Sequence, residues 1–166
     1  FITDFLGAGE MGYYLAPGVR NVPDPTESVR IRGDQLVPRD GRLELRVTNS
    51  ITLVTNSMPI TQEVLAWPSP NLIVLGGIYL PDYQATVGPQ TLTQLQDLTA
   101  DKVFLGTDGV TLDRGITTAN ILMAEVDRLM VERSHQAILV TDSSKFGRRG
   151  FVPVKSLKVF SKIITD

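Results

Sequence analysis

The sequence predicts an α/β fold built on a parallel sheet, and three observations support this. Short apolar runs rich in β-branched residues recur from residue 51 onward without polar alternation, as in strands covered on both faces. Stretches in which apolar residues recur with helical spacing separate these runs. Strands that alternate with helices are typical of βαβ units, whose strands pair in parallel.

The expected strands are the five apolar runs 51–55, 72–75, 103–105, 137–140 and 159–164. Three helices are expected between them. The first starts after Ser57, a candidate N-cap, has Pro59 in its first turn and ends at Trp67–Pro70. Pro89 opens the second helix, which has leucines at 92, 95 and 98. The third helix follows Thr117–Thr118 and carries an apolar stripe at 122, 126, 129 and 130.

The first fifty residues have a different pattern. A strand-like run, Phe1–Leu6, leads into glycines at 7, 9 and 12 that spell a dinucleotide-binding G-x-G-x-x-G. The helix that this motif should open meets Pro17 after about five residues, which is too short for a nucleotide-binding unit. Asp40–Gly41, between apolar residues, predicts a hairpin, and Pro17–Ser28 is expected to be a loop.

Composition excludes several classes of function. The chain has 166 residues, no cysteine and a single histidine, which rules out disulfides, thiolate sites and multi-histidine metal sites, and we expect no cofactor. A net charge of -2 has the wrong sign for a protein that coats nucleic acid. No apolar run approaches the roughly 18 residues that a membrane span needs. We therefore expect one cytoplasmic domain with no membrane partner.

Four of the expected core strands end in small polar residues or glycine. These endings are Thr55-Asn56-Ser57, Gly76-Gly77, Gly106-Thr107-Asp108-Gly109 and Asp142-Ser143-Ser144-Lys145. In an open parallel sheet, ligands bind beyond the carboxyl ends of the strands, where backbone N–H groups can also hold anions. A single ending of this kind would be an ordinary turn, but four together predict a ligand pocket along this edge.

The charged residues near this edge allow more than one interpretation. Lys145 can act as a point charge for a phosphate, whereas Arg148 and Arg149 are expected to face solvent. Asp108 and Asp142 can accept protons from sugar hydroxyls or can cap helices, and the sequence does not decide between these roles.

Two other titratable residues are less informative. Glu125 lies beside the apolar stripe of the third helix, so it is either partly buried with a partner or an ordinary surface glutamate. His135 follows that helix in a charged turn, and we expect no catalytic role for it.

Residues 51–166 resemble the C-terminal effector-binding domain of DeoR-family bacterial transcriptional regulators. The motifs that carry the resemblance are Leu53–Ile60, Leu75-Gly76-Gly77, Val87-Gly88-Pro89, Ala100–Val110, Gly115–Thr118, Glu125-Val126, Asp142–Gly147 and Ile163–Asp166. The string Asp142-Ser143-Ser144-Lys145-Phe146-Gly147 is the most specific of them in that context.

The resemblance implies a three-layer, Rossmann-like, mostly parallel sheet, similar to ribose-5-phosphate isomerase, glucosamine-6-phosphate deaminase and CoA transferases. It implies a single effector-binding domain over 1–166, with an atypical segment at 1–50, that binds a phosphorylated sugar or related metabolite. Family members contact operator DNA through a winged helix-turn-helix domain, which we expect to lie outside this chain. Such regulators read paired half-sites, so we expect a homodimer or homotetramer.

The strand ends and the resemblance together give one set of expected ligand-binding residues. They are Gly7, Gly9, Thr55, Asn56, Ser57, Gly76, Gly77, Asp108, Gly109, Thr117, Thr118, Glu125, Asp142, Ser143, Ser144 and Lys145.

The first phosphate loop of the family fits this sequence in two registers. One uses Gly7–Gly12, where Glu10 replaces a hydroxyl residue, and the other uses Asp40–Gly41, where Arg42 and Leu43 replace threonines. The first register fits slightly better, because Leu15-Ala16 follows it as the family pattern requires.

We expect a sensor domain rather than an enzyme. The alternative is a sugar-phosphate isomerase or deaminase on the same fold, which needs a positioned general base. Asp108, Glu125 and Lys145 could serve such an enzyme, but no histidine is expected near the edge. A third interpretation, a purely structural or oligomerising domain, predicts no stabilisation by phosphorylated sugars.

Overall fold

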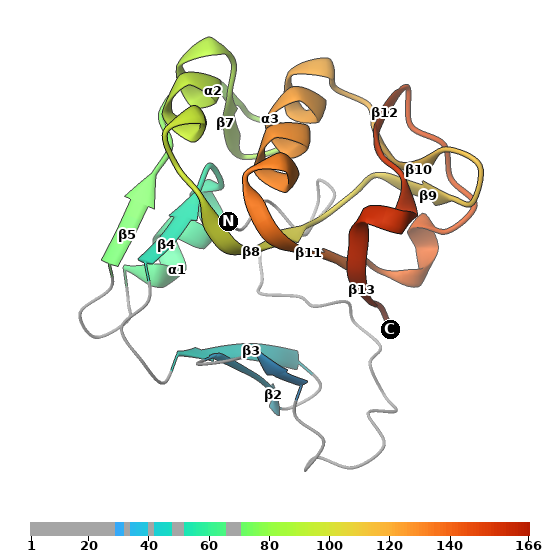
Figure 1. Cartoon of the computed structure of the whole chain (residues 1–166), viewed down its shortest axis with the longest axis horizontal. Helices are drawn as coiled ribbons and strands as arrows, with labels where there is room; N and C mark the ends of the chain where they lie inside the picture. Colours follow the sequence, from blue (N-terminus) through green and yellow to red (C-terminus); the bar gives the residue numbers. More distant parts are fainter. Residues whose placement is uncertain (1–28, 32–33, 40–41, 48–51, 66–70) are drawn as a thin grey trace.

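The computed structural model describes residues 29–31, 34–39, 42–47, 52–65 and 71–166. Its core consists of the five predicted strands, β4 (Thr52–Thr55), β5 (Asn71–Val74), β8 (Ala100–Leu105), β11 (Ser134–Val140) and β13 (Phe160–Ile164). β4 pairs with β5, and β11 pairs with β8 on one side and β13 on the other, all in parallel (Figure 1). The prediction of an α/β fold with parallel strands is therefore confirmed.

The three predicted helices are α1 (Met58–Val64), α2 (Pro89–Gln96) and α3 (Ile121–Glu132). Asn120 caps α3, because its side chain accepts hydrogen bonds from the backbone N–H groups of Leu122 and Met123. Ser57 occupies the N-cap position of α1 as predicted, but its side chain makes no capping hydrogen bond. In the part of the chain that the structure describes, no helix is long and apolar enough to cross a membrane.

Short antiparallel strands that the sequence analysis did not predict surround this core. β6 (Ile78–Leu80) pairs with β7 (Ala85–Val87). β10 (Gly115–Thr118) pairs with both β9 (Gly109–Thr111) and β12 (Val152–Lys155). Two 3-10 turns, η1 (Ser143–Lys145) and η2 (Leu157–Val159), complete the C-terminal part. These strands have three or four residues each, too few for a periodic signal in the sequence.

The N-terminal part contains β1 (Val29–Ile31), β2 (Asp34–Arg39) and β3 (Arg42–Val47). β2 and β3 are antiparallel, and Arg39 pairs with Arg42 across the turn, which confirms the predicted hairpin around Asp40–Gly41. A strand therefore follows this turn, whereas the phosphate loop of the second register should lead into a helix. The predictions for Phe1–Leu6, the glycines at 7, 9 and 12, and Pro17–Ser28 fall outside the described residues.

The carboxyl-terminal residues of β8 and β11 are buried on both faces, because each face packs against a different set of residues. β5 and β13 are mostly exposed. One cluster contains Val103 and Leu105 of β8 together with residues of α2 and α3. The other contains Phe104 of β8 together with Ile138 of β11 and Val64 of α1. Alternate residues of a strand point to opposite faces, so α2 and α3 cover one face and α1 contributes to covering the other (Figure 1). This explains why β8 and β11 appear in the sequence as continuous apolar runs.

Candidate functional site

The carboxyl ends of β4 and β5 form the first part of the site (Thr55, Asn56, Ser57, Gly76 and Gly77). We call it the buried half after its three buried side chains, although both glycines are exposed. Thr55, Asn56 and Ser57 are fully buried. Asn56 Nδ2 donates to the carbonyl oxygen of Thr86 at 2.9 Å, and the Thr86 N–H donates to the Asn56 carbonyl at 2.9 Å. Thr55 Oγ1 accepts a hydrogen bond from the Ser57 N–H at 3.1 Å. These contacts fix the end of β4 against β7.

Two buried side-chain atoms in this half lack a hydrogen-bond partner within the described residues. They are Asn56 Oδ1 and Ser57 Oγ. A buried polar atom without a partner costs roughly 1–3 kcal/mol, so such atoms are uncommon in native proteins. Their position at the end of a core strand is where an α/β sheet usually binds ligands.

The two glycines of the buried half lie against α2. The Gly76 carbonyl accepts a hydrogen bond from Thr91 Oγ1 at 2.7 Å, and the Gly76 N–H donates to Gln94 Oε1 at 3.2 Å. A Cβ at Gly77 would lie 2.2 Å from Thr91 Oγ1 and 2.5 Å from the Val87 carbonyl oxygen. Gly77 is therefore required by close packing, whatever its role towards a ligand.

The second part of the site, the charged half, contains Asp108, Gly109, Thr117, Thr118 and the segment Asp142–Lys145. Thr117 is buried, and its Oγ1 accepts a hydrogen bond from the Gly150 N–H at 2.7 Å and donates to the Gly109 carbonyl at 3.2 Å. A Cβ at Gly109 would lie 2.5 Å from the Arg148 carbonyl oxygen. Thr117 and Gly109 thus hold the loop that follows η1 against β9 and β10.

Asp108 is the most highly connected side chain of the charged half. Its Oδ2 accepts hydrogen bonds from Thr118 Oγ1 at 2.7 Å, the Ala119 N–H at 2.9 Å and the Tyr83 hydroxyl at 3.2 Å. The contact with Ala119, one residue before the α3 N-cap, agrees with the interpretation of Asp108 as a residue that secures a helix start. The side chain remains partly exposed, so a second role as a hydroxyl acceptor is compatible with this geometry.

Asp142 has the capping role that the sequence allowed. Its Oδ1 accepts hydrogen bonds from the backbone N–H of Ser144, at 3.0 Å, and from the Ser144 hydroxyl. The Ser143 N–H and hydroxyl donate to the carboxylate of Asp166 at 2.5 and 3.2 Å. The Ser143 N–H is the main reason that the pKa of Asp166 lies below its usual range. Both serines therefore have carboxylate partners within the protein.

Lys145 ends η1, and its side chain is partly buried. Arg149 differs from it, because the Arg149 guanidinium pairs with Asp113 at 3.1 Å and both side chains are exposed. This agrees with the prediction that Arg149 faces solvent.

Tyr83 contacts the charged half from a turn that lies beside the start of α1, and the sequence analysis missed it. It lies in the turn between β6 and β7, next to Gln84, whose carbonyl accepts the Met58 N–H at the start of α1. Its hydroxyl contacts Asp108 in the charged half. No motif identifies this tyrosine in the sequence, since it is a single aromatic residue in a short turn.

Glu125 lies on α3 as the sequence suggested. The prediction that His135 lies in a turn is wrong, because β11 begins at Ser134 and includes His135. Glu125 is partly exposed on α3, and the carboxylate that α3 buries is that of Asp127, only 6% exposed. His135 is exposed at the amino end of β11. Val140 lies five positions further along the strand, about 17 Å away, so His135 lies far from the carboxyl ends of the strands.

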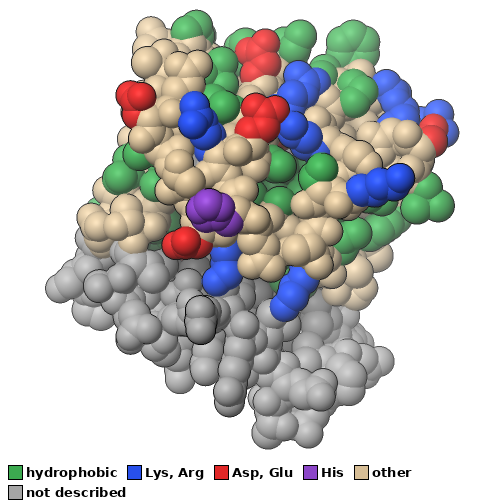
Figure 2. All heavy atoms as spheres, viewed as in Figure 1, with side chains coloured by type: hydrophobic (Ala, Val, Ile, Leu, Met, Phe, Trp, Pro, Cys, Tyr) green, Lys and Arg blue, Asp and Glu red, His purple; other side chains and the backbone are tan. Residues whose placement is uncertain are grey.

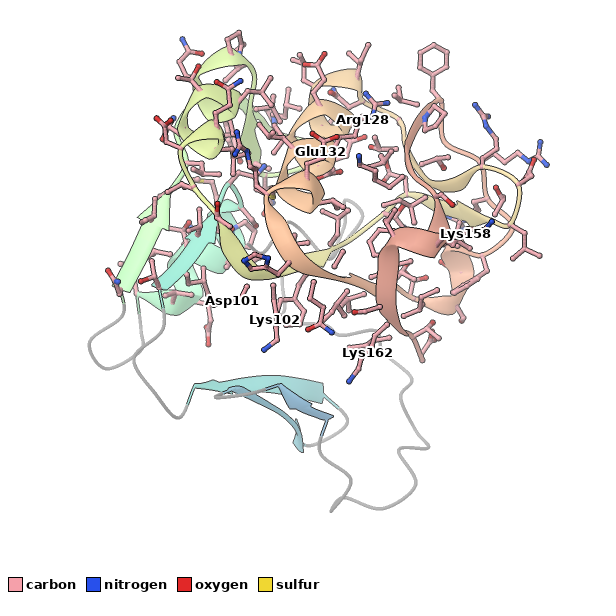
Figure 3. All side chains as sticks on the ribbon, in the orientation of Figure 1. Asp101, Lys102, Arg128, Glu132, Lys158 and Lys162 are labelled. Carbon is pink, nitrogen blue, oxygen red and sulfur yellow. The ribbon has the colours of Figure 1, made fainter. Side chains whose placement is uncertain are left out.

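Other cations in the described residues belong to different surfaces. Figure 3 shows Lys102 and Lys162 on the same side of the strands. Lys162 pairs with Ile138, so both lysines lie on the face that carries Phe104. Lys155 pairs with Glu132 of α3 at 2.8 Å. On the surface in Figure 2, Lys and Arg are scattered among Asp and Glu and form no continuous basic stripe on that face.

Comparison with known proteins identifies the family. The sequence model described as "DeoR C terminal sensor domain" matches residues 43–166, which extends the segment 51–166 on which the resemblance rests. The chain belongs to the DeoR family. The part that matches is the C-terminal sensor domain, which confirms the resemblance. Gly7 and Gly9 lie outside both the described residues and this match.

Relatives of this sensor domain are named as transcriptional regulators. The HTH-type transcriptional regulator GlpR of Haloferax volcanii is 36% identical over 78% of this chain and 48% of its own length. The uncharacterised HTH-type transcriptional regulator YulB of Bacillus subtilis is 35% identical over 70% of this chain and 45% of its own. An L-fucose operon activator of Haemophilus influenzae is 32% identical over 69% of this chain and 46% of its own length. The chain spans about half the length of the curated relatives that it matches.

Proposed function

We propose that this sensor domain binds a phosphorylated sugar or a related metabolite at the strand-end site and thereby changes operator binding by an attached winged helix-turn-helix domain. Membership of the DeoR family supports a regulatory role. The name of one relative, an L-fucose operon activator, supports a sugar-related effector. The rest of the proposal comes from the chemistry of the two halves of the site.

The observation that carries this proposal is the pair of buried atoms Asn56 Oδ1 and Ser57 Oγ. Both can accept a hydrogen bond, and Ser57 can also donate one. A ligand with several hydroxyl groups supplies the donors and acceptors that these atoms lack within the described residues. Two such atoms side by side at the end of β4 favour a ligand site there over a purely structural turn.

We assign the phosphate to Lys145. The backbone N–H groups of Ser143 and Ser144 donate to carboxylates of the protein, so they are committed to other acceptors. Lys145 provides a positive charge beside them on a partly buried side chain. The remaining residues of the expected set, including Gly7, Gly9, Thr117, Thr118 and Glu125, stay proposals.

We also infer the finer properties that the resemblance implies. The fold is a three-layer, Rossmann-like sheet similar to ribose-5-phosphate isomerase and CoA transferases. The domain binds its effector without chemical turnover, and the whole protein acts in the cytoplasm as a homodimer or homotetramer on operator DNA.

Thermal unfolding in the presence of ribose 5-phosphate, fructose 6-phosphate and glucosamine 6-phosphate tests the proposed function. A ligand that binds only the folded state stabilises it by about 2.7 kcal/mol at a concentration of 100 Kd, so at least one sugar phosphate should raise the melting temperature. Melting temperatures unchanged by all three would contradict the proposal. Formation of a ketose from ribose 5-phosphate, or of ammonia from glucosamine 6-phosphate, would instead indicate an enzyme.

Lys145→Ala tests the position of the phosphate. It should weaken binding of the stabilising sugar phosphate about ten- to a hundredfold, because it removes one charge-assisted contact worth roughly 1.5–3 kcal/mol. Arg149→Ala is the matched control, since Arg149 already pairs with Asp113 and exposed pairs contribute about 0–1 kcal/mol to stability. Calorimetric titration of both variants provides the measurement. Equal losses of affinity would remove Lys145 from the site.

A further inference from the structure

The position of Tyr83 is determined by its turn and by the core. The Tyr83 N–H donates to the Leu80 carbonyl at 3.2 Å, and the Gln84 N–H donates to the Pro81 carbonyl at 3.1 Å. Gln84 has a φ of 48°, a left-handed conformation that is uncommon for a residue with a side chain. The Tyr83 ring packs against the core cluster that includes α2 and α3. Packing on one side and a tight turn on the other thus direct the hydroxyl to Asp108.

The two oxygens of the Asp108 carboxylate have different surroundings. Oδ2 accepts all three hydrogen bonds, from Tyr83, Thr118 and the Ala119 N–H. No donor contacts Oδ1 within the described residues, and the side chain is partly exposed. Because three donors from two separate segments hold Oδ2, the carboxylate cannot rotate freely. Oδ1 is therefore a hydrogen-bond acceptor with a fixed direction.

The phenol of Tyr83 remains a donor at neutral pH. Burial is the main reason that its pKa is raised above the usual value, and the negative charge of Asp108 and its hydrogen bond raise the pKa further. The nearby Thr118 hydroxyl and Ala119 N–H oppose this rise, but the net pKa shift is upward. A neutral phenol that donates to a carboxylate makes a charge-assisted hydrogen bond, here 3.2 Å long.

We propose that Tyr83 is a positioning residue of the effector site, which orients Asp108 so that its Oδ1 accepts hydrogen bonds from hydroxyl groups of the bound sugar. This inference rests on the proposed function and specifies how the sugar part is recognised. A carboxylate repels the phosphate and needs a donor, so the phosphate binds elsewhere and Asp108 selects for hydroxyl groups. A site built to bond a hydroxyl strongly rejects ligands that lack it, because the acceptor is then left without a partner.

The test compares Tyr83→Phe with Tyr79→Phe. Tyr79 lies in β6 of the same hairpin and is 49% exposed, so its variant removes a hydroxyl without affecting Asp108. Calorimetric titrations use ribose 5-phosphate, fructose 6-phosphate and glucosamine 6-phosphate, with inorganic phosphate as the ligand that has no sugar. We expect Tyr83→Phe to weaken sugar phosphate binding about tenfold and to leave the affinity for inorganic phosphate unchanged. We expect Tyr79→Phe to bind all of these ligands like the unmodified protein.

A second measurement uses no ligand. Tyrosine ionisation followed by absorbance at 295 nm should show one tyrosine whose pKa lies above the ordinary value. This titration should be absent in Tyr83→Phe. In Asp108→Asn the pKa of Tyr83 should be lower than in the unmodified protein, because the negative charge is removed. Urea melts establish that each variant is folded.

The possible outcomes separate this inference from the proposed function. Binding by the unmodified protein together with an unchanged affinity of Tyr83→Phe overturns the role of Tyr83 and leaves the sensor function standing. Equal losses for sugar phosphates and inorganic phosphate overturn it as well, because they indicate general damage to the site. Absence of binding to every sugar phosphate overturns the proposed function and this inference with it.

Discussion

The two halves of the candidate site are built differently. In the buried half, Thr55, Asn56 and Ser57 are uncharged and fully buried, and they are fixed by hydrogen bonds to neighbouring backbone groups. In the charged half, Asp108 and Lys145 are partly exposed, and Ser143 and Ser144 are exposed. The charged half also depends on loop contacts rather than on strand packing alone, as the hydrogen bond from Gly150 to Thr117 illustrates.

This difference indicates a division of roles. Buried neutral groups provide a rigid acceptor and donor surface with little cost of reorganisation, whereas charged groups are stable only where water or a partner reaches them. We therefore expect substitutions that break the packing or the hydrogen bonds of the buried half to affect stability first, and substitutions of the charged side chains Asp108 and Lys145 to affect ligand affinity first. Three predictions test this expectation on stability.

The largest effect is expected for Gly77→Ala in the buried half. The new Cβ would lie 2.2 Å from Thr91 Oγ1, so the free energy of unfolding should fall by about 3 kcal/mol or more through overpacking and strain. The control is Gly147→Ala, two residues beyond Lys145, where the charged half ends. Gly77 has a φ of 152°. Gly147 also has a positive φ, 81°, but nothing lies within 4 Å of an added Cβ, so only the backbone cost of about 1–2 kcal/mol remains. Urea unfolding measures both, and similar losses would contradict the proposed difference in packing.

A smaller change in the free energy of unfolding should distinguish substitution of Asn56 from substitution of Ser57. Asn56→Ala removes the hydrogen bond to the Thr86 carbonyl and should reduce the free energy of unfolding by about 1–3 kcal/mol. Ser57→Ala removes a buried hydroxyl without a partner in the described residues, so stability should stay within about 1 kcal/mol or rise slightly. If Ser57 contacts the effector, Ser57→Ala should still lose affinity for the sugar phosphate. A large loss of stability in Ser57→Ala would show that its hydroxyl has a structural role.

The smallest effect concerns pH and the charged half. The pKa of Asp166 is lowered, mainly by the Ser143 N–H, so its contribution to stability is present above the ordinary aspartate pKa and is lost as pH falls through the lowered value. Urea midpoints of the unmodified protein and Asp166→Asn should therefore differ slightly at pH 7, and the difference should shrink below about pH 4. The carboxylate is exposed, so solvent limits the effect. A difference in urea midpoint that grows towards low pH would contradict the lowered pKa of Asp166.

The sequence by itself determined the five core strands, the three helices and the edge at which polar residues collect. These features depend on local periodicity, because strands covered on both faces need continuous apolar runs such as 137–140. The motif Asp142–Gly147 and its neighbours were sufficient to indicate the family, which the match over 43–166 confirms. The sequence also predicted the hairpin at Asp40–Gly41, since two-residue hairpin turns strongly favour the Asp-Gly pair.

Only the tertiary structure decided what each polar residue at that edge contacts. Asp108 and Asp142 look equivalent in the sequence, yet Asp142 caps η1 through Ser144 whereas Asp108 receives donors from two distant segments. Tyr83 lies 25 positions from Asp108, and no periodicity or spacing relates the two. Such contacts depend on how strands and turns pack in three dimensions, and the free energy of that packing is spread over the whole core rather than encoded near either residue.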